Sequence, residues 1–422
     1  MKQNNNTFRL GWKLLSIVFL LTVVLTACSS SDNDVIEPPI QDTTPYVTFS
    51  AKDKQYLTFT TESNLPKPNL QYSVNHGEWQ TIPADTKIGF GGKLGDLRLR
   101  GKSSWGTASY KIDPDFHLID RFWTIQFDVQ SILVDCKGDI RTLVDYEHYA
   151  TAETHEACFK WLFGWDSQLT SAPDLPATDL APNCYEKMFL NCTKLQKAPE
   201  LPATHLSKEC YMDMFWGCVE LKEASDLPAR ELTESCYKGM FCSCHSLTHP
   251  PKLPATKLAP FCYKSMFASC SLENAPQLPA TELAESCYED MFHYCCDLTT
   301  PPELPATHLA KACYKGMFQH CEQLKSTPIL KGDLTESCYK QMFQYCPKLS
   351  QVTMLAPNSL TEWAEMDEWL NGSGTEAKER SIKLLNEDVY QIMEEKTNSP
   401  LCGCKVLPKE WQKGDCNVTF EQ

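Results

Sequence analysis

The cysteines of this chain recur at a fixed spacing and are the first residues whose chemistry must be considered. The sequence of 422 residues contains 22 cysteines, and the pattern Cys-Tyr-x-x-Met-Phe-x-x-Cys begins at Cys184, Cys210, Cys236, Cys262, Cys287, Cys313 and Cys338. Exposed thiolates act as nucleophiles or bind metals, and adjacent thiols form disulfides. The two cysteines of each copy lie eight residues apart, and no histidine recurs beside them. That is not a zinc-ligand spacing, so we expect no metal site and no other cofactor.

The apolar residues around these cysteines indicate which element carries them. In the copy that begins at Cys184, they follow one another at spacings of four, four, four and three residues, at Leu180, Cys184, Met188, Cys192 and Leu195. Such a stripe is typical of one face of a helix, so we predict a helix over residues 180 to about 190. Eight residues of helix span about 12 Å, which is too far for a disulfide within a copy. We therefore expect two columns of buried thiols, with disulfides between neighbouring copies as the alternative.

The copies form an internal repeat with steps of 25 or 26 residues, and a degenerate eighth copy, Cys-Phe-x-x-Leu-Phe, begins at Cys158. After Leu195 and its equivalents the chain passes through prolines, which cannot donate to a strand ladder, so any strand there must be short. One unit cannot bury its own apolar face, whereas stacked units share a core. The sequence thus predicts an α/β fold: a leucine-rich-repeat-like solenoid of about eight units over residues 136–355, with one helix and a short strand per unit.

The segment Phe189-x-x-Cys192-x-x-Leu195 and its equivalents resemble the repeats of the BspA-like leucine-rich repeat surface lipoproteins of gut and oral Gram-negative bacteria. The resemblance covers residues 150 to about 355. It implies a stacked repeat fold and a role at the cell surface, since some members of that family are adhesins. The chain departs from the family at Ala198-Pro199, where typical members have an isoleucine-rich strand.

The N-terminal residues resemble a bacterial lipoprotein signal. Lys2, Arg9 and Lys13 precede an apolar run over residues 14–25, which is too short to span a bilayer. The run ends in Leu25-Thr26-Ala27-Cys28, which resembles the lipobox whose cysteine is lipidated after cleavage. We expect residues 1–27 to be removed, Cys28 to carry the lipid, and the polar residues 28–45 to form a disordered tether. The resemblance implies a lipid-anchored outer-membrane protein exposed at the cell surface.

Two segments that flank the repeats lack their pattern. Residues 46–135 contain short β-rich runs and a hairpin-type turn at Asn75-His76-Gly77, which predicts a small all-β sandwich domain of immunoglobulin-like shape. After Leu355 the repeat gives way to a charged helical stretch. We expect residues 356–422 to form a C-terminal cap over the last exposed apolar edge.

The net charge of the chain and the absence of catalytic motifs narrow the range of functions. The formal net charge is −15, and an acidic surface argues against nucleic acid or an anionic lipid surface as the partner. The sequence has no Gly-x-Ser-x-Gly, no phosphate-binding glycine loop and no His-Glu-x-x-His, so we expect no enzyme. We expect a binding or adhesion protein whose ligand is a protein or a glycan at the cell surface. Glycan binding in nutrient uptake and a structural spacer without a specific ligand are the alternatives.

The candidate ligand surface comes from positions that vary between copies. Stacking would bring side chains that follow each Met-Phe pair to one rim, at Trp165, Trp216, Tyr294, His320 and Tyr345. Exposed aromatic side chains are common binding hot spots, while packing of the edge is the alternative interpretation. A second candidate surface consists of Lys197, Lys222, His249 and Lys325.

Overall fold

The computed structural model of the chain describes residues 42–60, 69–82, 87–103, 106–112, 118–356, 366–398 and 406–421. The expected signal sequence and the expected lipidation site, Cys28, lie outside these residues. From Thr44 onward the chain forms one compact unit. Within the described ranges, no helix has the length and apolar character needed to cross a membrane.

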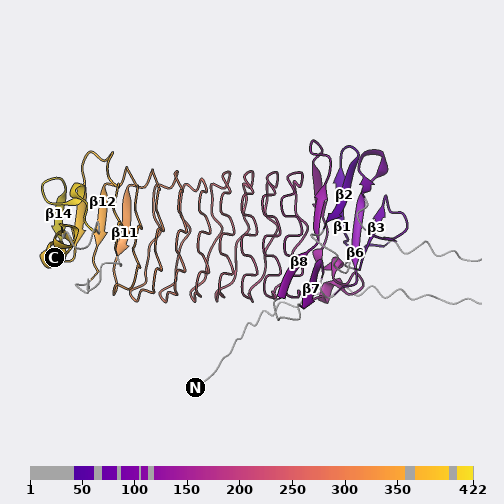
Figure 1. The fold of residues 1–422 in the computed structure, drawn as a ribbon, viewed down its shortest axis with the longest axis horizontal. Coiled ribbons are helices and arrows are strands. Elements are labelled where there is room, and N and C mark those ends of the chain that lie inside the picture. The colour runs from indigo at the N-terminus through magenta and orange to yellow at the C-terminus, as the bar shows by residue number, and fades with distance from the viewer. Residues whose placement is uncertain are drawn as a thin grey trace, which may run out of the picture. The chain divides into compact units, whose positions relative to one another are not determined.

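Short strands build the part of this unit that precedes the repeats (Figure 1). They are β1 (Val47–Ala51), β2 (Gln55–Thr60), β3 (Leu70–Val74), β4 (Gln80–Thr81), β5 (Ile88–Phe90), β6 (Leu97–Gly101), β7 (Ala108–Ile112), β8 (Leu118–Phe122), β9 (Thr124–Phe127) and β10 (Val134–Lys137). All pair antiparallel, in sheets ordered β10-β1-β6-β3-β4, β5-β2-β9 and β7-β8. Every second residue of β2 and of β6 is buried, because each strand turns one face to a core. Short 3-10 turns lie at Gly92–Leu94, Ile140–Leu143 and Tyr149–Thr151.

The core between these sheets continues into the first repeat. The rings of Phe49 and Phe127, which come from different sheets, lie 5.3 Å apart between centroids. The ring of Phe49 also lies 6.2 Å from that of Phe163 in the first copy. The Val134 amide of β10 donates to the carbonyl of Gln168 at 2.9 Å. The sheets and the repeats therefore share a core, and residue 135, where we expected a domain boundary, falls inside β10.

The repeats are built from hydrogen-bonded turns. Residues 152–325, all of them described, contain no α-helix and no strand longer than an isolated bridge. The helix expected over residues 180–190 is absent, so the predicted fold class, a solenoid of helix-plus-strand units, is wrong. In the copy at Cys184 the backbone amides alternate between two kinds of partner. Glu186 donates to the carbonyl of Asn183 within its turn at 3.1 Å, and Lys187 donates to the carbonyl of Met212 in the next copy at 2.9 Å.

The backbone dihedrals explain why the apolar stripe does not form a helix. Asn183, Lys187 and Asn191 have φ of 56°, 54° and 55°, so every fourth residue is left-handed. A right-handed helix cannot include such residues. The four-residue spacing of the apolar side chains therefore arises from successive turns. Half of the backbone amides in these turns donate to carbonyls of the next copy. The sequence pattern within one copy does not reveal these partners.

Aromatic side chains form two continuous columns through the stack of copies. The tyrosine after each first cysteine stacks on its equivalent, as Tyr185 does on Tyr211 with ring centroids 5.7 Å apart. The phenylalanine of each Met-Phe pair does the same, as Phe189 does on Phe215 at 5.5 Å and 1° between planes. These side chains are buried, and they form the shared core that a single copy could not provide.

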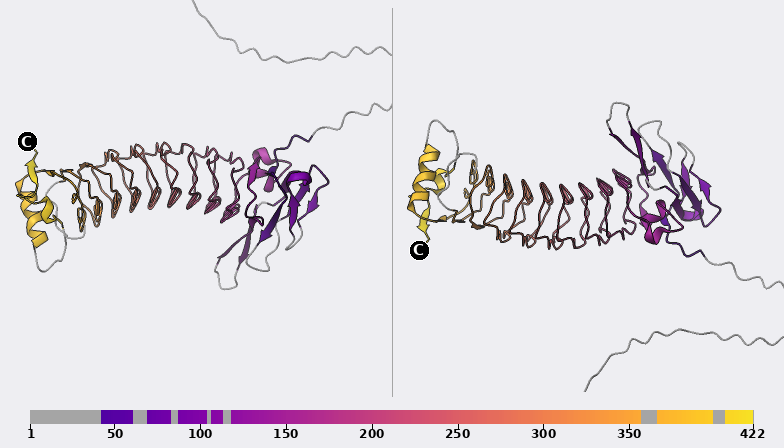
Figure 2. Two further views of the ribbon diagram at one scale, coloured as in Figure 1. Left: turned by 90° about the horizontal axis from the view of Figure 1, so that it is seen from above. Right: turned by 90° about the horizontal axis from the view of Figure 1, so that it is seen from below.

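Strands reappear where the repeats end. β11 (Ser326–Leu330), β12 (Gln351–Met354), β13 (Ser381–Leu384) and β14 (Asn417–Phe420) form a parallel sheet in that order. Isolated parallel bridges, such as that between Lys197 and Glu223, mark the same position in earlier copies. The helix α1 (Glu387–Asn398) and a 3-10 turn at Lys409–Trp411 lie between β13 and β14 in the chain (Figure 2). Trp369 and Trp411 are fully buried there.

Candidate ligand-binding surface

One position in each copy combines a constrained backbone with variable side chains. It is the seventh residue after the first cysteine, and we call these residues the rim column: Trp165, Asn191, Gly217, Ser243, Ser269, Tyr294, His320 and Tyr345. All eight have positive φ, between 55° and 75°. Glycine adopts this conformation freely and asparagine tolerates it, but a bulky side chain is strained there by about 1–2 kcal/mol. The column holds small residues in four consecutive copies and bulky rings in the copies at either side.

Three of the bulky residues form a continuous stack, which we call the aromatic ladder: Tyr294, His320 and Tyr345. The rings of Tyr294 and His320 lie 4.2 Å apart between centroids and within 5° of parallel. The rings of His320 and Tyr345 lie 4.7 Å apart at 31°. Tyr294 and Tyr345 remain 46% and 44% exposed, so the ladder presents its rings to solvent. Gly372 leaves room for the last ring, because a Cβ there would lie 2.6 Å from the ring of Tyr345.

The two tryptophans of the expected rim lie apart from this ladder. Trp165 belongs to the rim column and is 63% exposed, but four copies with small residues separate it from Tyr294. Trp216 comes one residue before the rim column, beside Gly217, and is also exposed. Neither indole makes a ring contact with another described residue. Of the five expected rim residues, the structure thus brings together three. On the second candidate surface, Lys197 forms an ion pair with Glu223 at 3.1 Å.

Burial disfavours the charged form of two histidines in this region, His293 and His320. Burial lowers the pKa of His320, and burial together with the nearby His320 lowers the pKa of His293. His293 packs beside the ladder, with its ring centroid 4.5 Å from that of Tyr294. The lowered pKa of His320 favours a neutral ring in the ladder.

A hollow of about 470 Å³ lies beside the Tyr294 end of the ladder. It is lined by Tyr294 itself and by His245, Ser269, Cys270, Ser271, Cys296 and Asp297. Ser269 occupies the rim column one copy before Tyr294. The hollow thus lies where the ladder would continue if the preceding copy also carried a ring.

The repeated cysteines are free thiols in two buried columns. Burial raises the pKa of these thiols, for example that of Cys236 to about 12. A neutral thiol is a poor nucleophile and a poor metal ligand at physiological pH. In the second column each thiol donates to a backbone carbonyl of the preceding copy, as Cys192 does to Phe163 at 3.0 Å. Cys242 and Cys296, which lie outside both columns, are only partly buried.

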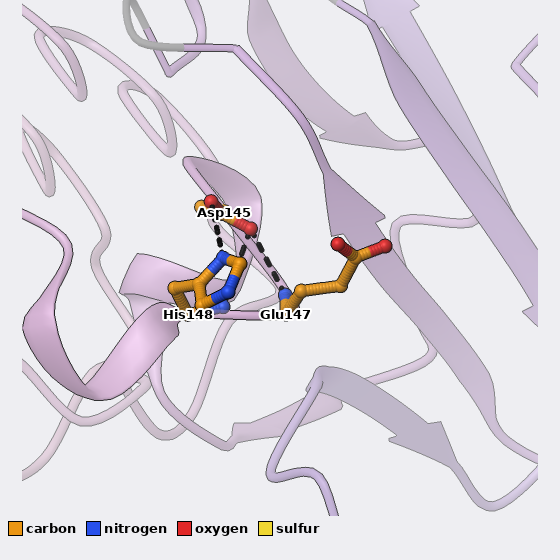
Figure 3. Close-up of side chains that lie close together, drawn as sticks. All are labelled: Asp145, Glu147 and His148. Carbon is orange, nitrogen blue, oxygen red and sulfur yellow. Dashed lines mark hydrogen bonds and ion pairs between the residues drawn. The ribbon is translucent and has the colours of Figure 1, made fainter.

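An acidic cluster near the first repeat offers the chemistry of a cation site, and Asp145, Glu147 and His148 compose it (Figure 3). Lys102 already supplies a cation there, with its Nζ 2.9 Å from Asp145 and 2.7 Å from Glu147. Hydrogen bonding to Lys102 holds the pKa of Asp145 and of Glu147 below their usual values. The cluster is therefore an ion-pair network of the chain itself.

Comparison with known proteins gives one distant structural similarity. No protein-family model matches the chain, and no curated protein is similar to it. A crystal structure of a leucine-rich repeat protein from Bacteroides ovatus is similar at 12% sequence identity and a TM-score of 0.18, over 64% of this chain and 87% of that chain. This similarity supports at most a general likeness to leucine-rich repeat proteins. It does not support membership of the BspA-like family. At that TM-score it carries no argument about fold or function.

Proposed function

We propose that this chain is a ligand-binding protein and that the aromatic ladder of Tyr294, His320 and Tyr345 contacts the ligand. One observation carries the proposal. Three bulky rings, of which the two tyrosines are exposed, stand at left-handed backbone positions where four other copies use asparagine, glycine or serine. The turn itself needs no ring there, because the copies with small residues form the same turn. Backbone strain that the fold does not require is a reason to look for function.

The chemistry of the ladder suits binding. Tyrosine side chains are prominent among binding hot spots, because they offer a large rigid surface at a small loss of conformational entropy. Rings that only sealed the edge of the repeats would be expected to lie buried, whereas the two tyrosines are almost half exposed. The ladder is also already stacked before a ligand arrives, which lowers the entropy cost of binding.

The sequence supports a location for this activity. We propose that Cys28 carries a lipid anchor and that the binding unit faces outward from the outer membrane, in contact with proteins and glycans outside the cell. Adhesion to a protein and capture of a glycan are the two forms this function would take. We propose no catalysis and no bound cofactor, since the sequence offers no catalytic motif.

The test is a binding screen with two matched variants. The full mature chain is applied to a glycan array and to a panel of host surface proteins, together with a ladder variant, Tyr294→Ser/His320→Ser/Tyr345→Ser. Trp165→Ser is the control, because it removes an exposed ring from the same column at a distant copy. We expect each true ligand to bind the wild type and the control, and the ladder variant at least about tenfold more weakly. Binding that is equal for the ladder variant, or no ligand in either screen, would contradict the proposal.

A further inference from the structure

The Tyr294 end of the aromatic ladder has an open ring face. One side of the Tyr294 ring is covered by His320 at 4.2 Å, and the rings are nearly parallel. On the side of the preceding copy the rim column holds Ser269, and the hollow of about 470 Å³ lies there. A flat ring in this hollow would extend the ladder by one position, with Tyr294 as its stacking partner.

The other groups around the hollow are polar and of mixed hydrogen-bonding character. Ser269 and Ser271 carry hydroxyls, which both donate and accept. Asp297 offers a carboxylate that only accepts, and His245 offers an imidazole with one donor and one acceptor nitrogen when neutral. Both Asp297 and His245 are exposed, so their polar atoms are available at the edge of the hollow.

We propose that this hollow is a subsite for one uncharged sugar ring, stacked on the open face of Tyr294. The inference rests on the proposed function, and it names the class of ligand. A pyranose has an apolar C–H face that matches the negative face of an aromatic ring, and its edge carries hydroxyls that both donate and accept. A guanidinium from a protein ligand would also stack on Tyr294, but it only donates and would leave the donors of the two serines and of His245 without partners.

The rest of the rim column lies away from the hollow. Beyond Ser269 the column continues with Ser243, Gly217 and Asn191, and the next bulky ring is that of Trp165. At roughly 4.8 Å per stacked copy, the five steps from Tyr294 to Trp165 cover on the order of 25 Å. A single sugar ring in the hollow beside Tyr294 therefore does not reach Asn191 or Trp165, and substitutions at these two residues serve as distant controls.

The experiment fills the hollow without removing the ladder. Ser269→Tyr places a ring in the rim column directly beside Tyr294, and Asn191→Tyr places the same ring three copies away as the control. The full mature chain is titrated with methyl glycosides of glucose, galactose and mannose, and with neutral oligosaccharides of each, by calorimetry and saturation-transfer NMR. We expect Ser269→Tyr to weaken binding of the monosaccharides at least about tenfold and Asn191→Tyr to leave it unchanged. Asp297→Asn keeps the fold and the hollow, and it is expected to weaken binding about threefold to tenfold.

The outcomes separate this inference from the proposed function. If a sugar is lost in the ladder variant but binds Ser269→Tyr and Asp297→Asn as it binds the wild type, the ladder binds ligand and the subsite is overturned. If no neutral sugar binds but an arginine-containing peptide does, with the same sensitivity to the ladder variant, the sugar assignment is overturned while the binding function stands. If no ligand of any class depends on the ladder, both fail.

Discussion

The thiol of Cys218 donates a hydrogen bond to the backbone carbonyl of Phe189 in the preceding copy, with 3.1 Å between Sγ and the oxygen. The same bond recurs along the second cysteine column, from Cys244 to Phe215 at 3.2 Å and from Cys270 to Phe241 at 3.0 Å. Cysteine fits this position because it fills a small apolar site and also carries a weak donor. The repeated cysteines thus link neighbouring copies without covalent bonds.

Removing this link should destabilise the stack. We expect Cys218→Ala to lower the free energy of unfolding by about 1–2 kcal/mol, because it removes buried volume and leaves the Phe189 carbonyl with one donor fewer. Urea unfolding followed by circular dichroism measures the change. Cys242→Ala is the matched control, since Cys242 lies outside the columns and is only partly buried. An equal effect of the two substitutions would show that the thiol-to-carbonyl hydrogen bond adds nothing measurable to the free energy of unfolding.

Asp166 should make the stability of the fold depend on pH. It stands in the first copy where later copies have the second cysteine, and it is 1% exposed. One carboxylate oxygen accepts from the Gln168 amide at 3.1 Å, while the other has no partner among the described residues. Burial raises the pKa of Asp166 to about 7. The folded chain therefore holds this proton more tightly than the unfolded chain, so the free energy of unfolding should fall as pH rises from about 4 to about 7.

Two substitutions of Asp166 test this pH dependence. Asp166→Asn keeps the shape and removes the titration, and Asp166→Cys restores the residue of the other copies. We expect both to be more stable than the wild type above pH 7, by a few kcal/mol at most, and to lose the slope between about pH 4 and 7. Thermal unfolding of the wild type and both variants, measured across that pH range, tests this expectation. A wild-type slope that persists in both variants would mean that Asp166 is not its source.

The turns of the repeats should be sensitive to side chains at certain left-handed positions. Gly316 has φ of 60°, and a Cβ there would lie 2.2 Å from Oδ1 of Asp290 in the preceding copy. We expect Gly316→Ala to cost about 1–3 kcal/mol, from backbone strain and displacement of Asp290. Ser265→Ala is the control, because Ser265 has the same place in its copy, has φ of 54° and already carries a Cβ. Unfolding midpoints that fall equally for both variants would contradict this account.

The sequence predicts the period of the repeat and the buried stripe, but it misleads about the backbone. Leu180, Cys184, Met188 and Cys192 follow a strict four-residue spacing, whereas a helix face mixes steps of three and four. That uniform spacing, with asparagine at both Asn183 and Asn191, was the available signal for successive left-handed turns. The hydrogen bonds that decide between turn and helix run to the next copy, and the pattern within one copy does not contain them.

The candidate site could be predicted only in part, because it too depends on contacts between neighbouring copies. Tyr294, His320 and Tyr345 stand at the same place in consecutive copies, which is why their rings stack. Trp216 belongs to the predicted rim but precedes the rim column by one residue, and strict alignment of the copies separates it from these three rings. The hollow beside Tyr294 is lined by Cys270 and Ser271, where this copy is one residue shorter than its neighbours before Leu272. The sequence shows this deletion but not the hollow that accompanies it.

The central claim is that the rings of the aromatic ladder are kept for binding and not for folding. The most direct measurement compares the wild type with Tyr294→Ser/His320→Ser/Tyr345→Ser in two quantities, the unfolding midpoint and the dissociation constant for a ligand found in the screen. We predict an unchanged or higher midpoint, because serine relieves the strain of bulky residues at positive φ, together with at least about tenfold weaker binding. A lower midpoint with unchanged affinity would show that the ladder is edge packing and would contradict the claim.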